Sequence, residues 1–302
     1  MYYDELNSGE TDWQAVVNEL SRIRDSGEYT TSDVDLVREM LTSEDERIRG
    51  AACLAAAGCL FEPNILDLMT EIAEYDPVTA IRKASIKSMG EVISEGIEQG
   101  FEDDAGSNNQ LDYAEEWDEY QSGSLRDEYQ RVKNLLFGIL DFEEDPGIIE
   151  ITVTALAELG YISEIREKIS ELYDGDSTSG KLAAMRAMGK FPHFWETEIA
   201  ETIRPETPPD VLKEAISAGF SSESQQISDA IEEVLNHEDP EIIRFALLSL
   251  GNIDLSPNLM QIFRQFRKHP DKGVQEAAQQ GLDRLSRLNF GDFMRESLGY
   301  ED

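Results

Sequence analysis

Apolar residues recur along this chain at the spacing of one helix face, and the segments that carry them end on a glycine. The stretch IIRFALLSLG at 242–251 is the most apolar example, with only an arginine and a serine among its hydrophobic residues. A helix that packs on one neighbour keeps a polar half, so a helix this apolar needs cover on several sides. The pattern therefore predicts inner helices that are enclosed by other helices.

The glycines that end these segments define a period. They stand at Gly58, Gly90, Gly160, Gly189, Gly219, Gly251 and Gly281. Their spacings are 32, 70, 29, 30, 32 and 30 residues, and the long interval equals one repeat plus an insertion. A fixed period in this range is typical of repeat solenoids. We expect each glycine at a helix end or tight bend, where a left-handed residue costs least.

Two apolar positions precede each glycine and lie on one helix face. Four residues before it stand Leu54, Ile86, Leu156, Met185, Ala215, Leu247 and Ala277. One residue before it stand Ala57, Met89, Leu159, Met188, Ala218, Leu250 and Gln280, of which only the last is polar. We expect this face to point into the core. Ala155, Ala184 and Ala246, five residues before their glycines, predict close approach of another helix.

Amphipathic segments alternate with the apolar ones and predict outer helices. They cover 32–41, 64–75, 125–140, 162–173, 225–236 and 258–268. Asp-Pro pairs before several apolar segments, such as Asp239-Pro240, suit the end of one helix and the start of the next. Ser43 followed by Glu46 predicts a capping box. Strand signals are essentially absent, so the fold class is all-α.

The predicted architecture is one right-handed α-solenoid of about seven helical hairpins over residues 1–302. Residues 12–31 form an N-terminal capping helix and loop, residues 94–124 an acidic insertion, and residues 289–302 a C-terminal tail. Terminal caps are expected because each repeat buries its apolar face only against neighbouring repeats.

Four segments carry a resemblance to a known family. They are ERIRGAACLAAAG at 46–58, TAIRKASIKSMG at 79–90, ITVTALAELG at 151–160 and EIIRFALLSLG at 241–251. Together with their amphipathic partners they resemble HEAT repeats of the short, phycobilisome-lyase-type variety. The resemblance implies an α-solenoid that acts mostly as a binding scaffold, although some relatives are lyases or other enzymes.

The charge of the chain restricts its partners. With 63 acidic against 26 basic residues the formal net charge is −37, and no long basic run is present. Nucleic acid and anionic membranes are therefore poor partners. The acidity either reflects an acidic host proteome or attracts basic proteins. The N-terminus lacks the pattern of a secretory signal and no apolar run is long enough to span a bilayer, so we expect a cytoplasmic protein.

Catalytic and metal-binding patterns are missing from the sequence. The three histidines lie in separate repeats, and Cys53 and Cys59 stand about 240° apart on one helix, so they cannot pair within it. HEAT-repeat deoxyhypusine hydroxylases bind iron through several His-Glu pairs, but this chain has only His237-Glu238, which we expect to be a cap or surface pair. We therefore expect no enzyme activity, no metal and no cofactor.

Two surfaces are candidates for binding a protein partner. If positions four and one before each glycine face the core, positions three and six face an inner groove, which would then be mildly basic and apolar. Alternatively, the apolar residues at positions three and six pack between adjacent inner helices. The candidate residues of this groove are Lys87, Arg186, Lys213, Ile216, Phe245 and Leu248.

The insertion is the second candidate surface, with ten acidic and no basic residues over 94–124. Its candidate contacts are Asp103, Asp104, Tyr113, Trp117 and Tyr120. These aromatic residues either fold back onto the solenoid or dock on a basic partner. The basic stretch 261–290 suggests a further hypothesis, weak self-association with the insertion of another copy.

These features together favour a non-catalytic protein-binding scaffold or adaptor with an acidic surface. The alternative is a lyase-like or chaperone-like accessory factor for a chromophore-bearing protein or a metalloprotein.

Overall fold

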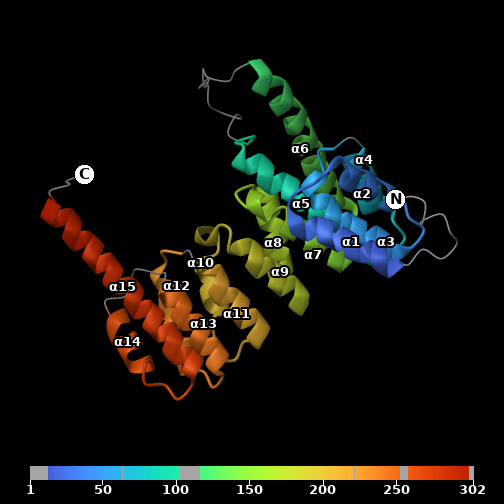
Figure 1. Cartoon of the computed structure of the whole chain (residues 1–302). Helices are drawn as coiled ribbons and strands as arrows, with labels where there is room; N and C mark the ends of the chain where they lie inside the picture. Colours follow the sequence, from blue (N-terminus) through green and yellow to red (C-terminus); the bar gives the residue numbers. More distant parts are fainter. Residues whose placement is uncertain (1–12, 63, 103–115, 221, 252–257, 299–302) are drawn as a thin grey trace. The chain divides into compact units, whose positions relative to one another are not determined.

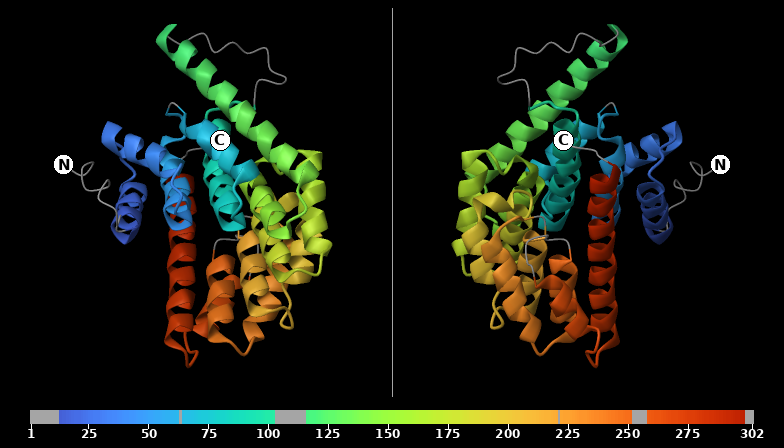
Figure 2. Two further views of the ribbon diagram at one scale, coloured as in Figure 1. Left: turned by 90° about the vertical axis from the view of Figure 1, so that its right-hand side faces the viewer. Right: turned by 90° about the vertical axis from the view of Figure 1, so that its left-hand side faces the viewer.

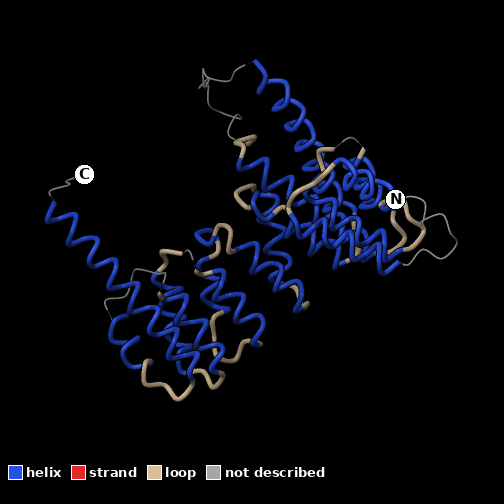
Figure 3. Tube along the Cα trace, viewed as in Figure 1, coloured by secondary structure: helices blue, strands red, loops and turns tan. Residues whose placement is uncertain are grey.

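The structure is a computed structural model that describes residues 13–62, 64–102, 116–220, 222–251 and 258–298. Every regular element in these ranges is helical, and none is a strand (Figures 1 and 3). The predicted all-α solenoid fold is thereby confirmed, since the helices pack in order along the chain. The contacts group into two units, Met1–Leu159 and Gly160–Asp302, which are described separately. A single continuous right-handed array remains a prediction.

Unit 1 contains a row of inner helices with outer helices packed on it. The inner helices are α1 (Trp13–Ser26), α3 (Glu46–Ala55), α5 (Thr79–Glu98) and α7 (Pro146–Ala155), and each packs on the next. The outer helices are α2 (Thr31–Met40), α4 (Ile65–Tyr75) and α6 (Glu116–Phe142), and each packs on the inner helix that follows it. Short 3-10 turns, η1 (Ala56–Cys59) and η3 (Ala157–Leu159), follow α3 and α7. The predicted N-terminal capping helix is thus α1, at the first inner position.

Unit 2 repeats this arrangement. Its inner helices are α9 (Thr178–Met188), α11 (Pro209–Ala218), α13 (Pro240–Leu250) and α15 (Lys272–Leu298). Its outer helices are α8 (Ser163–Asp174), α10 (Glu196–Thr202), α12 (Gln225–Glu233) and α14 (Leu259–Phe266), with 3-10 turns η4 (Pro192–Phe194) and η5 (Val234–Asn236). Within their own units, α6 and α15 extend beyond the neighbouring helices (Figure 2). Helix α15 includes most of the segment predicted as a C-terminal tail.

Helix starts follow the predicted punctuation, with one correction. Asp145 and Asp239 accept hydrogen bonds from the first-turn N–H groups of α7 and α13, and proline occupies the first turn of both helices. The capping box predicted for α3 is wrong. Asp45 caps that helix by accepting from the Arg47 N–H at 2.9 Å, while the Ser43 hydroxyl accepts from the N–H of Asp45.

The predicted core face is confirmed in the middle five repeats. Positions four and one before Gly90, Gly160, Gly189, Gly219 and Gly251 are all buried. In the first repeat Leu54 and Ala57 are only half-buried, and in the last repeat Gln280 is exposed. The last inner helix, α15, packs on one inner helix only, whereas α3 has inner helices on both sides, and its repeat buries Ala52, Cys53, Ala55 and Ala56 instead.

The predicted place of the repeat glycines at a helix end is confirmed for Gly189, Gly219 and Gly251, the C-cap residues of α9, α11 and α13, but the predicted left-handed conformation is wrong. None of them has a positive φ, a conformation found among the described glycines only at Gly27 and Gly100, and Gly90 and Gly281 lie inside helices. They instead allow close approach. A Cβ at Gly189 would lie 2.9 Å from the Cα of Ala218 on the next inner helix, and one at Gly90 would lie 3.2 Å from Ala155.

Serine hydroxyls and arginine ion pairs tie successive repeats together. Ser88 of α5 donates to the Cys53 carbonyl of α3 at 2.8 Å, and Ser249 of α13 donates to the Ile216 carbonyl of α11. In unit 1, Arg49 of α3 binds Asp76 in the loop before α5 at 2.8 Å, and both side chains are largely buried, with exposures of 13% and 4%. Arg82 of α5 binds Glu143 before α7 in the same way. Each arginine therefore fixes the start of the next inner helix.

Two glycine-to-alanine substitutions test whether the glycines allow close approach, and they should change the free energy of unfolding in opposite directions. Gly189→Ala should lower the free energy of unfolding by about 1–3 kcal/mol, because its methyl group would overlap backbone atoms of α11. Gly138→Ala in α6 is the control, since nothing lies within 4 Å of a Cβ there, and it should stabilise by about 0.5–1 kcal/mol. Thermal or urea unfolding measures both changes. Stabilisation by both variants would contradict the assignment.

The Arg82–Glu143 pair generates a pH prediction. Hydrogen bonds to the Glu143 carboxylate from the Asp145 N–H, from the Arg82 side chain and from the Glu144 N–H lower its pKa below the ordinary value of 4.5. Because the folded-state pKa is depressed, this stabilisation is present above pH 4.5 and is lost as the pH falls through the folded-state pKa. Urea unfolding should show Glu143→Gln to be less stable than the parent at neutral pH, with a difference that shrinks in acid. An equal difference at every pH would contradict this.

Candidate functional site

The exposed side chains of α9, α11 and α13 form one surface in unit 2, here called the inner-helix face. Ion pairs between successive helices cross this face. Arg186 of α9 binds Glu214 of α11 at 3.0 Å, and Lys213 of α11 lies 3.8 Å from Glu241 of α13. Glu241 also binds Arg244 on its own helix.

Phe245 lies among these charges on α13. The Lys213 ammonium lies 5.9 Å from the centroid of the Phe245 ring, and the Arg244 guanidinium lies 5.3 Å from the same centroid. Phe245 and Leu248 are both half-buried. The face therefore offers apolar surface framed by charged groups that are themselves already paired.

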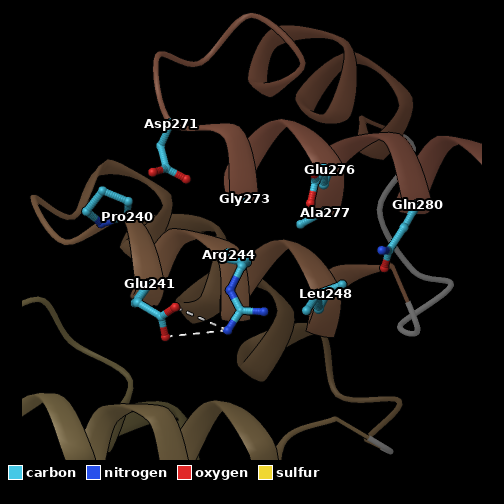
Figure 4. Close-up of a pocket in the computed structure, with 9 residues that line it drawn as sticks. All are labelled: Pro240, Glu241, Arg244, Leu248, Asp271, Gly273, Glu276, Ala277 and Gln280. Carbon is cyan, nitrogen blue, oxygen red and sulfur yellow. Dashed lines mark hydrogen bonds and ion pairs between the residues drawn. The ribbon is translucent and has the colours of Figure 1, made fainter.

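A cleft of about 430 Å³ lies between α13 and α15, next to this face (Figure 4). Arg244 and Leu248 line it from α13, and Ala277 lines it from α15. Its carboxylates, Glu241, Asp271 and Glu276, outnumber its single arginine. This cleft is therefore acidic, while the mildly basic character of the inner groove stays a prediction. Every cation of the face named above has a carboxylate or an aromatic ring beside it.

The candidate groove residues divide into exposed and buried ones. Lys87 is exposed on α5 of unit 1, and Arg186 is exposed on α9 of unit 2. Lys213, Phe245 and Leu248 are half-buried on the inner-helix face. Ile216 is only 1% exposed, so it packs between adjacent inner helices, as the alternative interpretation required. Binding of a partner by the exposed members stays a prediction.

Residues 103–115 of the insertion, which include Asp103, Asp104 and Tyr113, lie outside the described residues. Trp117 and Tyr120 belong to α6, which begins at Glu116, but their side chains are not described. The structure does show how the insertion is held at Glu102, in a cluster that sequence reasoning missed. The Tyr129 hydroxyl donates to the Glu102 carboxylate at 2.6 Å, and the Lys133 ammonium binds the same carboxylate at 2.7 Å.

The histidines whose contacts are described lie in turns or at the surface. His237 accepts a hydrogen bond at Nδ1 from the Asp239 N–H at 2.9 Å, and His269 accepts likewise from Asp271. His237 therefore caps a turn, as predicted. Within the described ranges, no three His, Cys, Asp or Glu side chains are grouped as metal ligands would be. No described helix is both long and apolar enough to cross a membrane.

Both cysteines are buried and unpaired with each other. Burial is the main cause that raises the pKa of the Cys53 thiol to about 12 and that of Cys59 to about 11. A thiol needs to lose its proton to act as a nucleophile or a metal ligand. Neither cysteine is therefore prepared for chemistry in the folded protein.

No family model matches this chain, and no curated protein matches it. Solved structures do match along most of its length. An engineered protein from the Northeast Structural Genomics Consortium shares 15% identity over 93% of this chain and 94% of its own, with a TM-score of 0.33. The designed armadillo repeat protein YIII(Dq)4CqI shares 14% over 93% and 97%, with a TM-score of 0.31. The helix packing described above, rather than these similarities, establishes the repeat fold.

The protonated, buried cysteines predict slow thiol labelling. In the folded protein at pH 8, both thiols should resist an aromatic disulfide reagent and react together only on unfolding in denaturant. Absorbance of the released thiolate measures the labelling. Fast labelling of either cysteine in the native state would show that it is accessible as thiolate.

Proposed function

We propose that this chain is a non-catalytic protein-binding scaffold or adaptor built from short HEAT-type repeats. The observation that carries the proposal is the inner-helix face, where Phe245 and Leu248 stay partly exposed within a row of ion-paired side chains. Repeat proteins commonly bind partners on the extended surface that their stacked repeats create. Interface anchors are commonly aromatic or aliphatic groups surrounded by polar contacts.

The exposed ion pairs support recognition of a partner that carries both charges. Arg186 is 55% exposed in its pair with Glu214, and such surface pairs contribute little stability, at most about 1 kcal/mol. A partner carboxylate can therefore take over the arginine, and a partner cation can take over the glutamate, at small cost. We propose a partner segment with mixed charge and an apolar anchor that meets Phe245 and Leu248.

The charge of the chain also limits the class of partner. The net charge of −37 supports a protein partner over nucleic acid or an anionic membrane. We further propose that the protein acts in the cytoplasm, without a cofactor. Self-association remains a separate hypothesis. Arg264, Arg267 and Lys268 are exposed at the end of α14, but the side chains of residues 103–124 of the insertion that would receive them are not described.

Partner capture with matched variants tests the proposed function. The intact protein and the variant Phe245→Ala/Leu248→Ala are cross-linked in lysate, and captured proteins are quantified by mass spectrometry. At least one partner should be lost by roughly tenfold from this variant, since truncation of interface anchors costs 1–2 kcal/mol or more. The control Tyr75→Ala/Phe142→Ala removes two exposed aromatic side chains from unit 1. It should retain that partner.

Circular dichroism confirms that both variants fold before capture is compared. Identical partner profiles for the intact protein and the inner-helix-face variant would contradict the proposal.

A further inference from the structure

A second surface of unit 2 lies between the outer helices α8 and α10, away from the inner-helix face. Outer helix α10 packs directly on α12, but between α8 and α10 a groove of about 510 Å³ is open. We call it the outer groove. Ser163, Arg166, Glu167, Ser170, Glu171 and Asp174 line it from α8, and Phe194, Trp195 and Glu198 line it from the start of α10.

The α8 wall is one complete face of that helix. Its six residues follow the spacing 0, 3, 4, 7, 8 and 11, so they form a single stripe along the helix. The opposite face carries Ile165 and Ile169, which are fully buried. The stripe therefore faces outward, because the opposite face of α8 is buried. Three residues of the stripe, Glu167, Glu171 and Asp174, carry carboxylates.

Aromatic rings form the other wall. Phe194 is 39% exposed and lies 4.1 Å from His193 and 5.8 Å from Trp195 between ring centroids. Trp195 is 3% exposed and forms the base. The Arg166 guanidinium lies 4.5 Å from the centroid of the Phe194 ring, which shows that this ring accepts a guanidinium group.

The charge of the outer groove is strongly one-sided. Four carboxylates line it against one cation, Arg166. Glu171 has an ion pair with Lys168 at 3.1 Å. Among the described residues, Glu167, Asp174 and Glu198 have no basic side chain within ion-pair distance. Carboxylates beside exposed aromatic rings are the chemistry that binds a lysine or arginine side chain.

We propose that the outer groove binds an extended segment of a partner protein with arginine or lysine at alternate positions. Glu167 and Glu171 are one helical turn apart, about 6 Å along α8. Side chains two residues apart in an extended chain are separated by nearly the same distance, roughly 6.6–7 Å. Alternating cations therefore match successive carboxylates of the stripe, and the cation next to the aromatic wall stacks on Phe194.

The net charge favours a different protein over a second copy as the source of this segment. Two molecules of charge −37 repel each other, whereas a basic partner is attracted over a distance of several ångströms. The outer groove and the inner-helix face share no residues. Failure of one proposal therefore leaves the other intact.

A labelled peptide of four Arg-Ala repeats is the probe, and fluorescence anisotropy at low ionic strength measures its binding to the full chain. Phe194→Ala should weaken binding by roughly threefold to tenfold through loss of the aromatic wall. Its control is Phe220→Ala, which truncates another exposed phenylalanine of unit 2 without changing the charge. This control should bind as the parent does.

The carboxylates are tested by a second matched pair. Glu167→Gln/Glu171→Gln should weaken binding by roughly threefold to tenfold. The variant Glu91→Gln/Glu95→Gln removes the same charge, at the same spacing, from exposed positions of α5 and should weaken it less. A peptide with four contiguous arginines followed by four alanines should bind more weakly than the alternating one. Equal effects of both double variants, with no effect of Phe194→Ala, would reduce the interaction to net charge and overturn the proposal.

Discussion

The close approach of successive inner helices is the constraint on which the structure depends. An inner helix has neighbours on both sides and an outer helix behind it, so little of its circumference can be polar. Large side chains at the contact between inner helices would push the rows apart. Gly90 opposite Ala155 and Gly189 opposite Ala218 show how small residues avoid this. At Gly90 and Gly189, glycine is therefore a packing requirement and not a turn requirement.

Close packing also creates a need for polar groups to be satisfied inside the rows. Ser88 and Ser249 meet that need by donating to carbonyls of the preceding inner helix. Each hydroxyl is small enough to fit the contact and contributes about 1 kcal/mol when its hydrogen bond is made. The Arg49–Asp76 pair has a comparable task at the helix starts, where it orders a loop and the helix after it. Unit 1 thus relies on directional contacts as well as apolar burial.

The periodicity of the sequence is sufficient to predict the fold, because the buried positions recur in each repeat at the same places on the inner helix. The stripes before Gly160 and Gly251 became core residues as expected, and the exposed Gln280 marks the last repeat. The role of the glycines was not predictable from the sequence, because their φ angles and the helix that faces them are set by the tertiary structure. Ile216 illustrates the same limit. Its position relative to Gly219 equals that of Arg186 to Gly189, yet only the neighbouring helix decides whether such a position is covered.

The contacts around Glu102 have a consequence for the evolution of the chain. Tyr129 and Lys133 hold Glu102, and Arg126 donates to the carbonyl of Phe101. Phe101 and Glu102, the last described residues before segment 103–115, are therefore held against α6, the helix that follows this segment. The entropy of closing a loop between fixed ends rises only slowly with its length, by about 0.6 kcal/mol for each doubling. This junction can accept new sequence of almost any size while the repeats on either side keep their packing, which makes it the place where such a chain can acquire an additional domain.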